Sequence, residues 1–307
     1  MKSLMRLLLG VSVVGCSQNP PASHEHHSSN APASELSAQI EAVRSTTERY
    51  RDIENARRDG YRLFGKEGPL MGEHWYHPDI VKQPLDLRHP STLQYAIING
   101  RRELVGVAYT VYNRPGEPLP EGFAGSDDHW HVHDVDKIAR AITEERPFLR
   151  WLVDQRIARG KSGAGNGRTH LTMLHAWIWS DNPDGVFALE HKALPYLRAG
   201  IPAHYAQHAD EFAPYGVTLL DKRGCDWELG KIRLLAKPAK DQMLRLSRAC
   251  SGAAEQVRKS DVARLNDVAS RAWQDYLFVR NSVLTQAQKD RLVVGIEHKN
   301  QPAHQHH

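Results

Sequence analysis

The sequence lacks the local motifs that mark common enzyme classes. It has no Gly-x-Ser-x-Gly turn of a serine hydrolase, no Walker loop, no Gly-x-Gly-x-x-Gly dinucleotide fingerprint and no His-Glu-x-x-His zinc helix. It also lacks a strong charge of either sign, because 40 Lys and Arg are interspersed with 36 Asp and Glu. We therefore expect no nucleic-acid partner, since such binding needs a concentrated basic surface.

The N-terminus lacks an apolar run long enough to cross a membrane. Its run at residues 7–14 is far shorter than the ~20 residues of a transmembrane helix. Because Lys2 and Arg6 precede the run, it is typical of a secretory signal peptide that is removed. The run ends in VVGC, which resembles a bacterial lipobox whose cysteine becomes the lipid-modified N-terminus. We predict a signal peptide over 1–15 and a lipid anchor on Cys16 that holds a soluble protein at a membrane.

The residues after the lipobox indicate which membrane and how the anchor is joined to the protein. By resemblance to bacterial lipoproteins, Ser17 rather than Asp favours the outer membrane of a Gram-negative cell, on its periplasmic side. The alternative is an ordinary signal peptide cleaved elsewhere, with Cys16 incidental. Residues 16–34 are rich in Pro, Ser and Ala, contain histidines and show no periodicity, which predicts a flexible tether.

Cysteine is scarce, with three residues in the chain. If Cys16 carries lipid, Cys225 and Cys250 remain as a pair in an oxidising compartment, which favours a disulfide between them. A Cys-based metal site or a catalytic thiol is the alternative, but neither cysteine has a histidine near it in the sequence.

Charge and periodicity divide the remaining chain into two regions. Residues 16–220 hold four more acidic than basic residues, whereas residues 221–307 hold six more basic than acidic ones. We predict an α+β domain over 35–220, in which an antiparallel sheet with a hairpin is covered by helices. A small helical region with a His-rich tail is expected over 221–307.

Local patterns place the main elements. Spaced apolar residues predict an amphipathic helix over roughly 35–60. Asn99-Gly100 lies between two β-branched and aromatic runs, which predicts a hairpin from 93–98 and 103–112. Further expected elements are a strand at 129–133, a helix interrupted at Pro147 over 135–158, and a strand at 171–179.

The sharpest chemical pattern is the segment DDHWHVHD at residues 127–134. Alternate residues of a strand share a face, so His129, His131 and His133 are expected to project together. Imidazoles at this spacing can bind one transition metal ion. The neighbouring Asp residues can then act as further ligands or accept the second imidazole N–H. The alternative is a solvated histidine face over a core strand.

Two more segments contain candidate ligands. His74 lies in MGEHWYHP and His175 in HLTMLHAWIW, and both are expected to join the site if the fold brings them to the histidine strand. In each segment the alternative is plain packing, as an aromatic plug or a core histidine. Met71 and Met173 favour copper among the transition metals, because a thioether is a soft ligand.

Motifs over roughly residues 45–195 resemble a family of bacterial secreted proteins that has no assigned activity. The resemblance implies an extracytoplasmic location and marks His74 and His175 as motif positions. It rests on Gly60-Tyr61 after the early helix, MGxHW at 71–75, LVGVxY at 104–109 and LHxWxWxxNPxGxFA at 174–188.

Two non-catalytic functions remain open from the sequence. The first is a lipid-anchored, extracytoplasmic protein that binds copper or zinc for buffering, delivery or sensing, with ligands from His74, His129, His131, His133 and His175. The second is a structural envelope lipoprotein that holds no metal.

A metal-dependent enzyme is the remaining hypothesis. An open, His-ligated ion can activate water for hydrolysis or handle oxygen. Glu73 or Asp128 is then the candidate base, and the long loop at 114–128 is the candidate lid over the site.

Overall fold

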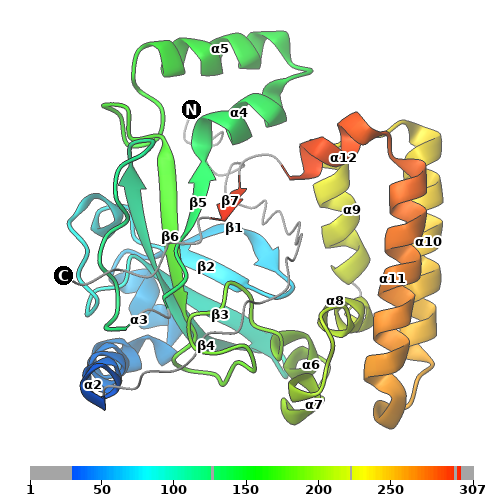
Figure 1. Ribbon diagram of the computed structural model, residues 1–307, viewed down its shortest axis with the longest axis horizontal. Coiled ribbons are helices and arrows are strands. Elements are labelled where there is room, and N and C mark those ends of the chain that lie inside the picture. Colours follow the sequence, from blue (N-terminus) through cyan, green and yellow to red (C-terminus); the bar gives the residue numbers. More distant parts are fainter. Residues whose placement is uncertain (1–29, 126–127, 222, 294–295, 299–307) are drawn as a thin grey trace.

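The computed structural model describes residues 30–125, 128–221, 223–293 and 296–298 (Figure 1). It is 50% helical, and its strands form one antiparallel sheet, so the predicted α+β class is confirmed. The predicted signal peptide, Cys16, residues 16–29 of the predicted tether and the His-rich tail lie outside the described residues. The prediction of a flexible tether up to residue 34 was wrong at its end, because residues 30–34 form the start of the first helix, Asn30–Thr47.

The sheet in the described part of the chain has seven strands in the order β1-β2-β3-β4-β6-β5-β7. Every neighbouring pair is antiparallel. The strands are β1 (Arg62–Gly68), β2 (Gly72–Tyr76), β3 (Thr92–Ile98), β4 (Arg101–Asn113), β5 (His131–Asp134), β6 (His170–Ala176) and β7 (Ile296–His298). The strand β5 therefore lies between β6 and the last strand of the chain, where His131 pairs in register with His298.

The predicted hairpin joins β3 to β4. Its two turn residues, Asn99 and Gly100, have φ of 50° and 75°, as in the turns that match the twist of paired strands. The long strand β4 pairs with β3 on one side and with β6 on the other. It therefore links the first half of the sheet to the strands that carry the predicted histidine site.

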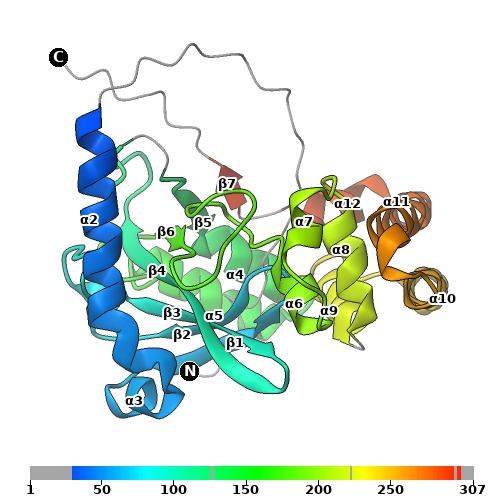
Figure 2. The ribbon, with the colours of Figure 1, turned by 90° about the horizontal axis from the view of Figure 1, so that it is seen from below.

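One face of the sheet is apolar, and we call it the apolar face. The helices α2 (Asn30–Thr47) and α3 (Ile53–Arg58) cover it, with Val43 and Ala56 buried against the strands. Figure 2 shows α2 lying along one side of the sheet. The strand residues of this cluster include Trp75, Leu93, Tyr95, Val107, Tyr109 and Leu174.

The helix predicted over 35–60 is divided into α2, the short helix η1 (Glu48–Arg51) and α3. Asp52 has extended backbone angles, φ −87° and ψ 111°, and its side chain accepts a hydrogen bond from the N–H of Glu54. Asp at this position satisfies a free N–H at a helix start, so a new helix begins here. The predicted interruption at Pro147 separates α4 (Val135–Thr143) from α5 (Pro147–Ala158).

The later helices form a second hydrophobic cluster, which we call the helical cluster. It includes Ile138 and Ile142 of α4 as well as residues from α6 onward. Figures 1 and 2 show these later helices beside the sheet, at some distance from α2. They are α6 (Leu194–Arg198), α7 (His204–Gln207), α8 (Ala213–Val217), α9 (Arg223–Leu235), α10 (Lys240–Arg258), α11 (Leu265–Val283) and α12 (Gln286–Leu292). The short helix η3 (Thr218–Leu220) follows α8, η4 (Val262–Arg264) precedes α11, and η2 (Ile80–Lys82) lies outside this region, between β2 and β3.

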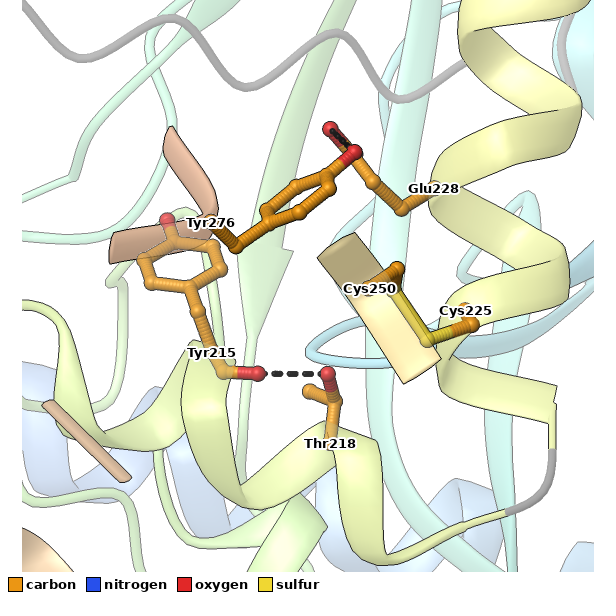
Figure 3. The surroundings of a disulfide bond; sticks show 6 residues. All are labelled: Tyr215, Thr218, Cys225, Glu228, Cys250 and Tyr276. Atoms are coloured by element: carbon orange, nitrogen blue, oxygen red, sulfur yellow. Dashed lines mark hydrogen bonds between the residues drawn. A yellow bond between two sulfur atoms is a disulfide. The ribbon is translucent and has the colours of Figure 1, made fainter. Parts of the chain in front are cut away.

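A disulfide between Cys225 and Cys250 links α9 to α10 within the helical cluster (Figure 3). It joins the two cysteines that the sequence left as a pair. Beside it, the buried carboxylate of Glu228 lies 3.0 Å from the Lys231 ammonium and 3.1 Å from the Arg280 guanidinium. Within the described ranges, the helices include none that is both long and apolar enough to cross a membrane.

Candidate metal centre

Strand register places four of the predicted histidines on the face of the sheet opposite the apolar face. His74 of β2 pairs with Gln94 of β3, which pairs with Gly106 of β4. Two residues further along β4, Ala108 pairs with His175 of β6. On the far side of β6, His131 pairs with Met173 and His133 pairs with Leu171. Paired residues and alternate residues point to the same side of a sheet, so all four imidazoles share one face, the histidine face.

The four rings also lie close together. The ring centroids are 5.5 Å apart for His74 and His175, 5.1 Å for His131 and His175, and 4.9 Å for His131 and His133. In a flat sheet, β2 and β6 would be separated by about 14 Å, because they are three strand spacings apart. The 5.5 Å separation therefore requires a sheet that curves toward the histidine face. Figure 1 shows this in the way β1, β2 and β3 run across the direction of β5 and β6.

Gly106 lets the strands in the middle of the sheet pack closely. A Cβ on this residue would lie 2.8 Å from the carbonyl oxygen of Ala176 and 3.2 Å from Oε1 of Gln94. The first distance is shorter than side chains normally tolerate, so a larger residue would push the neighbouring strand away. The absence of a side chain here keeps β4 close to its neighbours between His74 and His175.

Burial keeps the imidazoles of His74 and His175 neutral. His175 is 1% exposed and His131 is 3% exposed, while His74 and His133 are half-buried. The pKa of His175 is lowered to about 3, chiefly by burial and also by the nearby His74 and His133, against the raising effect of the hydrogen bond to the Leu189 backbone. Burial likewise lowers the pKa of His74 to about 4. A neutral imidazole has a free electron pair, which is the form that binds a metal ion.

The two ring nitrogens of His175 have different neighbours. Nδ1 lies 2.7 Å from the carbonyl oxygen of Leu189, which can only accept a hydrogen bond, so Nδ1 carries the proton. Nε2 lies 3.1 Å from Sδ of Met173. The electron pair of Nε2 therefore faces a thioether sulfur within the histidine face.

His129 is not part of the ring cluster. The predicted strand at 129–133 begins two residues later, at His131, and His129 is exposed. The alternation that would have placed His129 beside His131 therefore does not extend to it. Trp130 is buried on the apolar side, where its indole N–H donates to Asp128 over 3.2 Å.

The predicted acidic partners of the histidine strand have other roles. Asp134 caps α4, because its Oδ1 accepts a hydrogen bond from the backbone N–H of Lys137. Asp128 accepts the Trp130 hydrogen bond, and Asp127 lies outside the described residues. Asp134 was expected to be a further ligand or to accept an imidazole N–H, and the local signal for capping, an acidic residue before a helix, was not weighed.

Glu73, the other candidate base, lies on the apolar side, because it alternates with His74 along β2. Arg102 donates two hydrogen bonds to its carboxylate, and the indole of Trp75 donates a third. Burial alone would raise the pKa of Glu73, but these hydrogen bonds hold it below its usual value. The carboxylate is thus a fixed ion-pair partner directed away from the imidazoles.

The loop at 114–128 also packs away from the histidines. Its Phe123 is buried on the apolar face, with ring centroids 5.7 Å from Tyr109 and 4.9 Å from Phe187. The backbone N–H of Ala124 donates to Gln39 of α2. The loop is therefore a cover for the apolar core, and the prediction of a lid over the histidine strand was wrong.

Two polar residues of the histidine face were missed. Gln94 and Thr110 are buried, and register places them beside His74 and Met173. Among the described residues, Oε1 of Gln94 and Oγ1 of Thr110 have no hydrogen-bond partner. Such polar side chains, alternating with apolar ones along a strand, were the signal in the sequence that this face is not an ordinary core.

The described residues contain no group of three or more His, Cys, Asp or Glu side chains already arranged around a metal position. The imidazoles are therefore adjacent without forming a finished coordination sphere of that kind. Methionine sulfur is not one of those four donor types, and Met173 lies against His175.

Comparison with known proteins adds no assignment. No protein-family model, curated protein or solved structure matches the chain. The resemblance to bacterial secreted proteins therefore stays a prediction, and the function is argued from the site itself.

Proposed function

We propose that this protein binds one transition metal ion, copper or zinc, through His74, His131, His133 and His175. The observation that carries the proposal is the approach of imidazole rings from three strands to within 4.9–5.5 Å of one another. Two imidazoles bound to one tetrahedral ion at the usual metal–nitrogen distance have centroids about 5 Å apart. The spacing of neighbouring rings therefore suits a shared ion after small side-chain rotations.

The environment also supports metal binding. Burying the electron pair of His175 Nε2 beside a thioether sulfur costs free energy, and an ion that accepts this electron pair offsets the cost. The carbonyl of Leu189 holds the His175 ring by its second nitrogen, as outer contacts commonly hold metal-binding histidines. The unpartnered oxygens of Gln94 and Thr110 lie on the same face and can accept hydrogen bonds from ordered water.

A binding role has more support than a hydrolytic one. The two carboxylates considered as bases, Glu73 and Asp128, are each held by other side chains. We propose buffering, delivery or sensing of the ion by a protein held at the outer membrane through lipid on Cys16. The disulfide between Cys225 and Cys250 supports an oxidising compartment, because such bonds persist mainly outside the cytosol.

The test is metal stoichiometry in the full chain. Because terminal histidines can bind metal loosely, the reference protein has His24, His26, His27, His304, His306 and His307 replaced by Ala. After equilibrium dialysis, elemental analysis should find one copper or zinc ion per chain. Changing both His131 and His133 to Ala should abolish binding, whereas His129→Ala, an exposed neighbour, should leave the stoichiometry unchanged.

Loss of binding through misfolding is separated by a second measurement. In the unmutated histidine face, the imidazole nitrogen NMR signals of His131 and His175 should shift during zinc titration. A reference protein that retains no ion, or ring signals that do not move, would rule out the proposed function.

A further inference from the structure

The proposal above leaves the identity of the ion open, and the contact between Met173 and His175 bears on it. Both residues are on β6, two positions apart, so they share the histidine face. Both are buried, with exposures of 8% and 1%. The distance from Sδ of Met173 to Nε2 of His175 is 3.1 Å.

No hydrogen atom lies between Sδ of Met173 and Nε2 of His175 to form a hydrogen bond. Nδ1 of His175 donates its hydrogen to the Leu189 carbonyl, which leaves Nε2 with an electron pair and no hydrogen. A thioether sulfur also has electron pairs and no hydrogen to donate. Two electron-pair donors thus face each other in a buried position, an arrangement that a shared cation stabilises.

The distance between Sδ and Nε2 agrees with binding of a shared cation. When one ion binds a nitrogen at about 2.0 Å and a sulfur at about 2.3 Å, the two donor atoms are roughly 3–4 Å apart for bond angles between a right angle and trigonal. The observed separation of 3.1 Å lies within that range. Register also places His131 directly opposite Met173, and the His131 ring is 5.1 Å from that of His175.

We propose that the resident ion is Cu(I), bound by Sδ of Met173 and Nε2 of His175 together with the imidazole of His131. This inference rests on the proposed function and specifies its metal. The reason is ligand softness: a thioether contributes strongly to Cu(I) and little to the borderline ion Zn(II). The site needs no change of oxidation state, because it takes the ion up and releases it as Cu(I).

Met71 provides a matched control. It is also a buried methionine, with an exposure of 7%. It lies elsewhere, however, because it lines a small cavity with Glu190, Tyr215 and Trp273, toward the helical cluster. Of the two methionines that the sequence suggested as soft ligands, the structure places only Met173 against an imidazole.

The experiment measures Cu(I) and Zn(II) affinities separately, by anaerobic competition with a chromogenic chelator for each ion. The full chain with its terminal histidines replaced is compared with its Met173→Leu and Met71→Leu variants. Met173→Leu should weaken Cu(I) binding at least tenfold and change Zn(II) binding less than twofold. Met71→Leu should change neither, because leucine conserves the volume of methionine.

The outcomes separate the two proposals. If the unsubstituted site binds neither ion, the proposed function itself fails. If it binds Zn(II) but Met173→Leu leaves Cu(I) binding unchanged, or weakens both ions equally, only the Cu(I) inference is overturned. Selenomethionine labelling tests the contact without any substitution: selenium-edge X-ray absorption of the Cu(I)-loaded protein should show a selenium–copper distance near the bond length, and its absence would overturn the inference.

Discussion

The helical cluster and the histidine face treat buried polar groups in different ways. In the helical cluster, the carboxylate of Glu228 is paired with two side chains of opposite charge, Lys231 and Arg280. It also accepts a hydrogen bond from the hydroxyl of Tyr276 (Figure 3). On the histidine face, imidazoles lie beside one another, and the side-chain oxygens of Gln94 and Thr110 have no partner within the described residues.

This difference distinguishes buried polar groups that pair with one another from buried polar groups whose partner is not part of the described fold. A buried ion pair with satisfied hydrogen bonds is self-contained, and removing one member leaves an uncompensated charge. Buried polar groups without partners cost stability in the free protein, so they are more common at sites that bind something. The comparison therefore indicates a structural role for the charges around Glu228 and supports the proposed binding role of the histidine face.

The largest effect is expected from breaking the ion cluster. Glu228→Gln should lower the free energy of unfolding by about 3–5 kcal/mol, because Lys231 and Arg280 lose their counter-charge inside the protein. Chemical denaturation monitored by circular dichroism measures this change. Glu255→Gln is the matched control: its pair with Lys259 is exposed, so we expect a much smaller change. Equal effects for the two variants would contradict the structural role of Glu228.

The next effect is the dependence of stability on pH that the buried carboxyl of Glu190 causes. Burial raises the pKa of Glu190 from 4.5 to about 7, against the lowering effect of the Tyr215 hydrogen bond and the nearby lysines. The folded protein holds this proton more tightly than the unfolded chain, so the contribution of Glu190 to stability is greatest below pH 4.5. This contribution is lost as the pH rises toward 7. We expect a loss of about 2 kcal/mol across this window, reduced from the full conversion because the residue is partly exposed.

Urea denaturation at several pH values measures the contribution of Glu190. The difference in unfolding free energy between the wild type and Glu190→Gln should change by that amount between pH 4.5 and 7. A constant difference across the window would show that Glu190 titrates normally.

The smallest effect is expected on the histidine face itself. Thr110→Val removes a buried hydroxyl that has no hydrogen-bond partner, so the metal-free protein should be as stable as the wild type or up to about 1 kcal/mol more stable. Thr143→Val is the matched control in α4, where the hydroxyl donates to the carbonyl of Ala139 over 2.7 Å. That variant should lose about 1 kcal/mol. Thermal unfolding of the Thr110→Val and Thr143→Val variants measures both changes in stability. Equal losses in the two variants would contradict the comparison.

Local sequence patterns predicted the parts of the site that depend on strand alternation and turn chemistry. His131 and His133 share a face because they are two residues apart, and Asn99-Gly100 forms the hairpin because both residues accept positive φ. The cysteine count indicated the pair that the structure joins. Each of these inferences needs only neighbours in the chain.

The remaining features depend on contacts between distant segments. The approach of His74 to His175 results from curvature across three strand spacings, which no local pattern encodes. His129 lies apart from the ring cluster because its strand begins later than the alternation suggested, and Asp134 caps α4, a role that was not weighed from the sequence. The ion cluster at Glu228 includes Arg280, 52 residues further along the chain.

The position of β7 has a consequence for the order in which the protein matures. The strand that carries His131 and His133 receives its outer neighbour from residues 296–298, which lie far from it along the chain. Pairing over such a long sequence separation forms late, since closing a long loop is entropically costly. If the histidine face binds the proposed ion, loading of that ion before this pairing forms is therefore disfavoured.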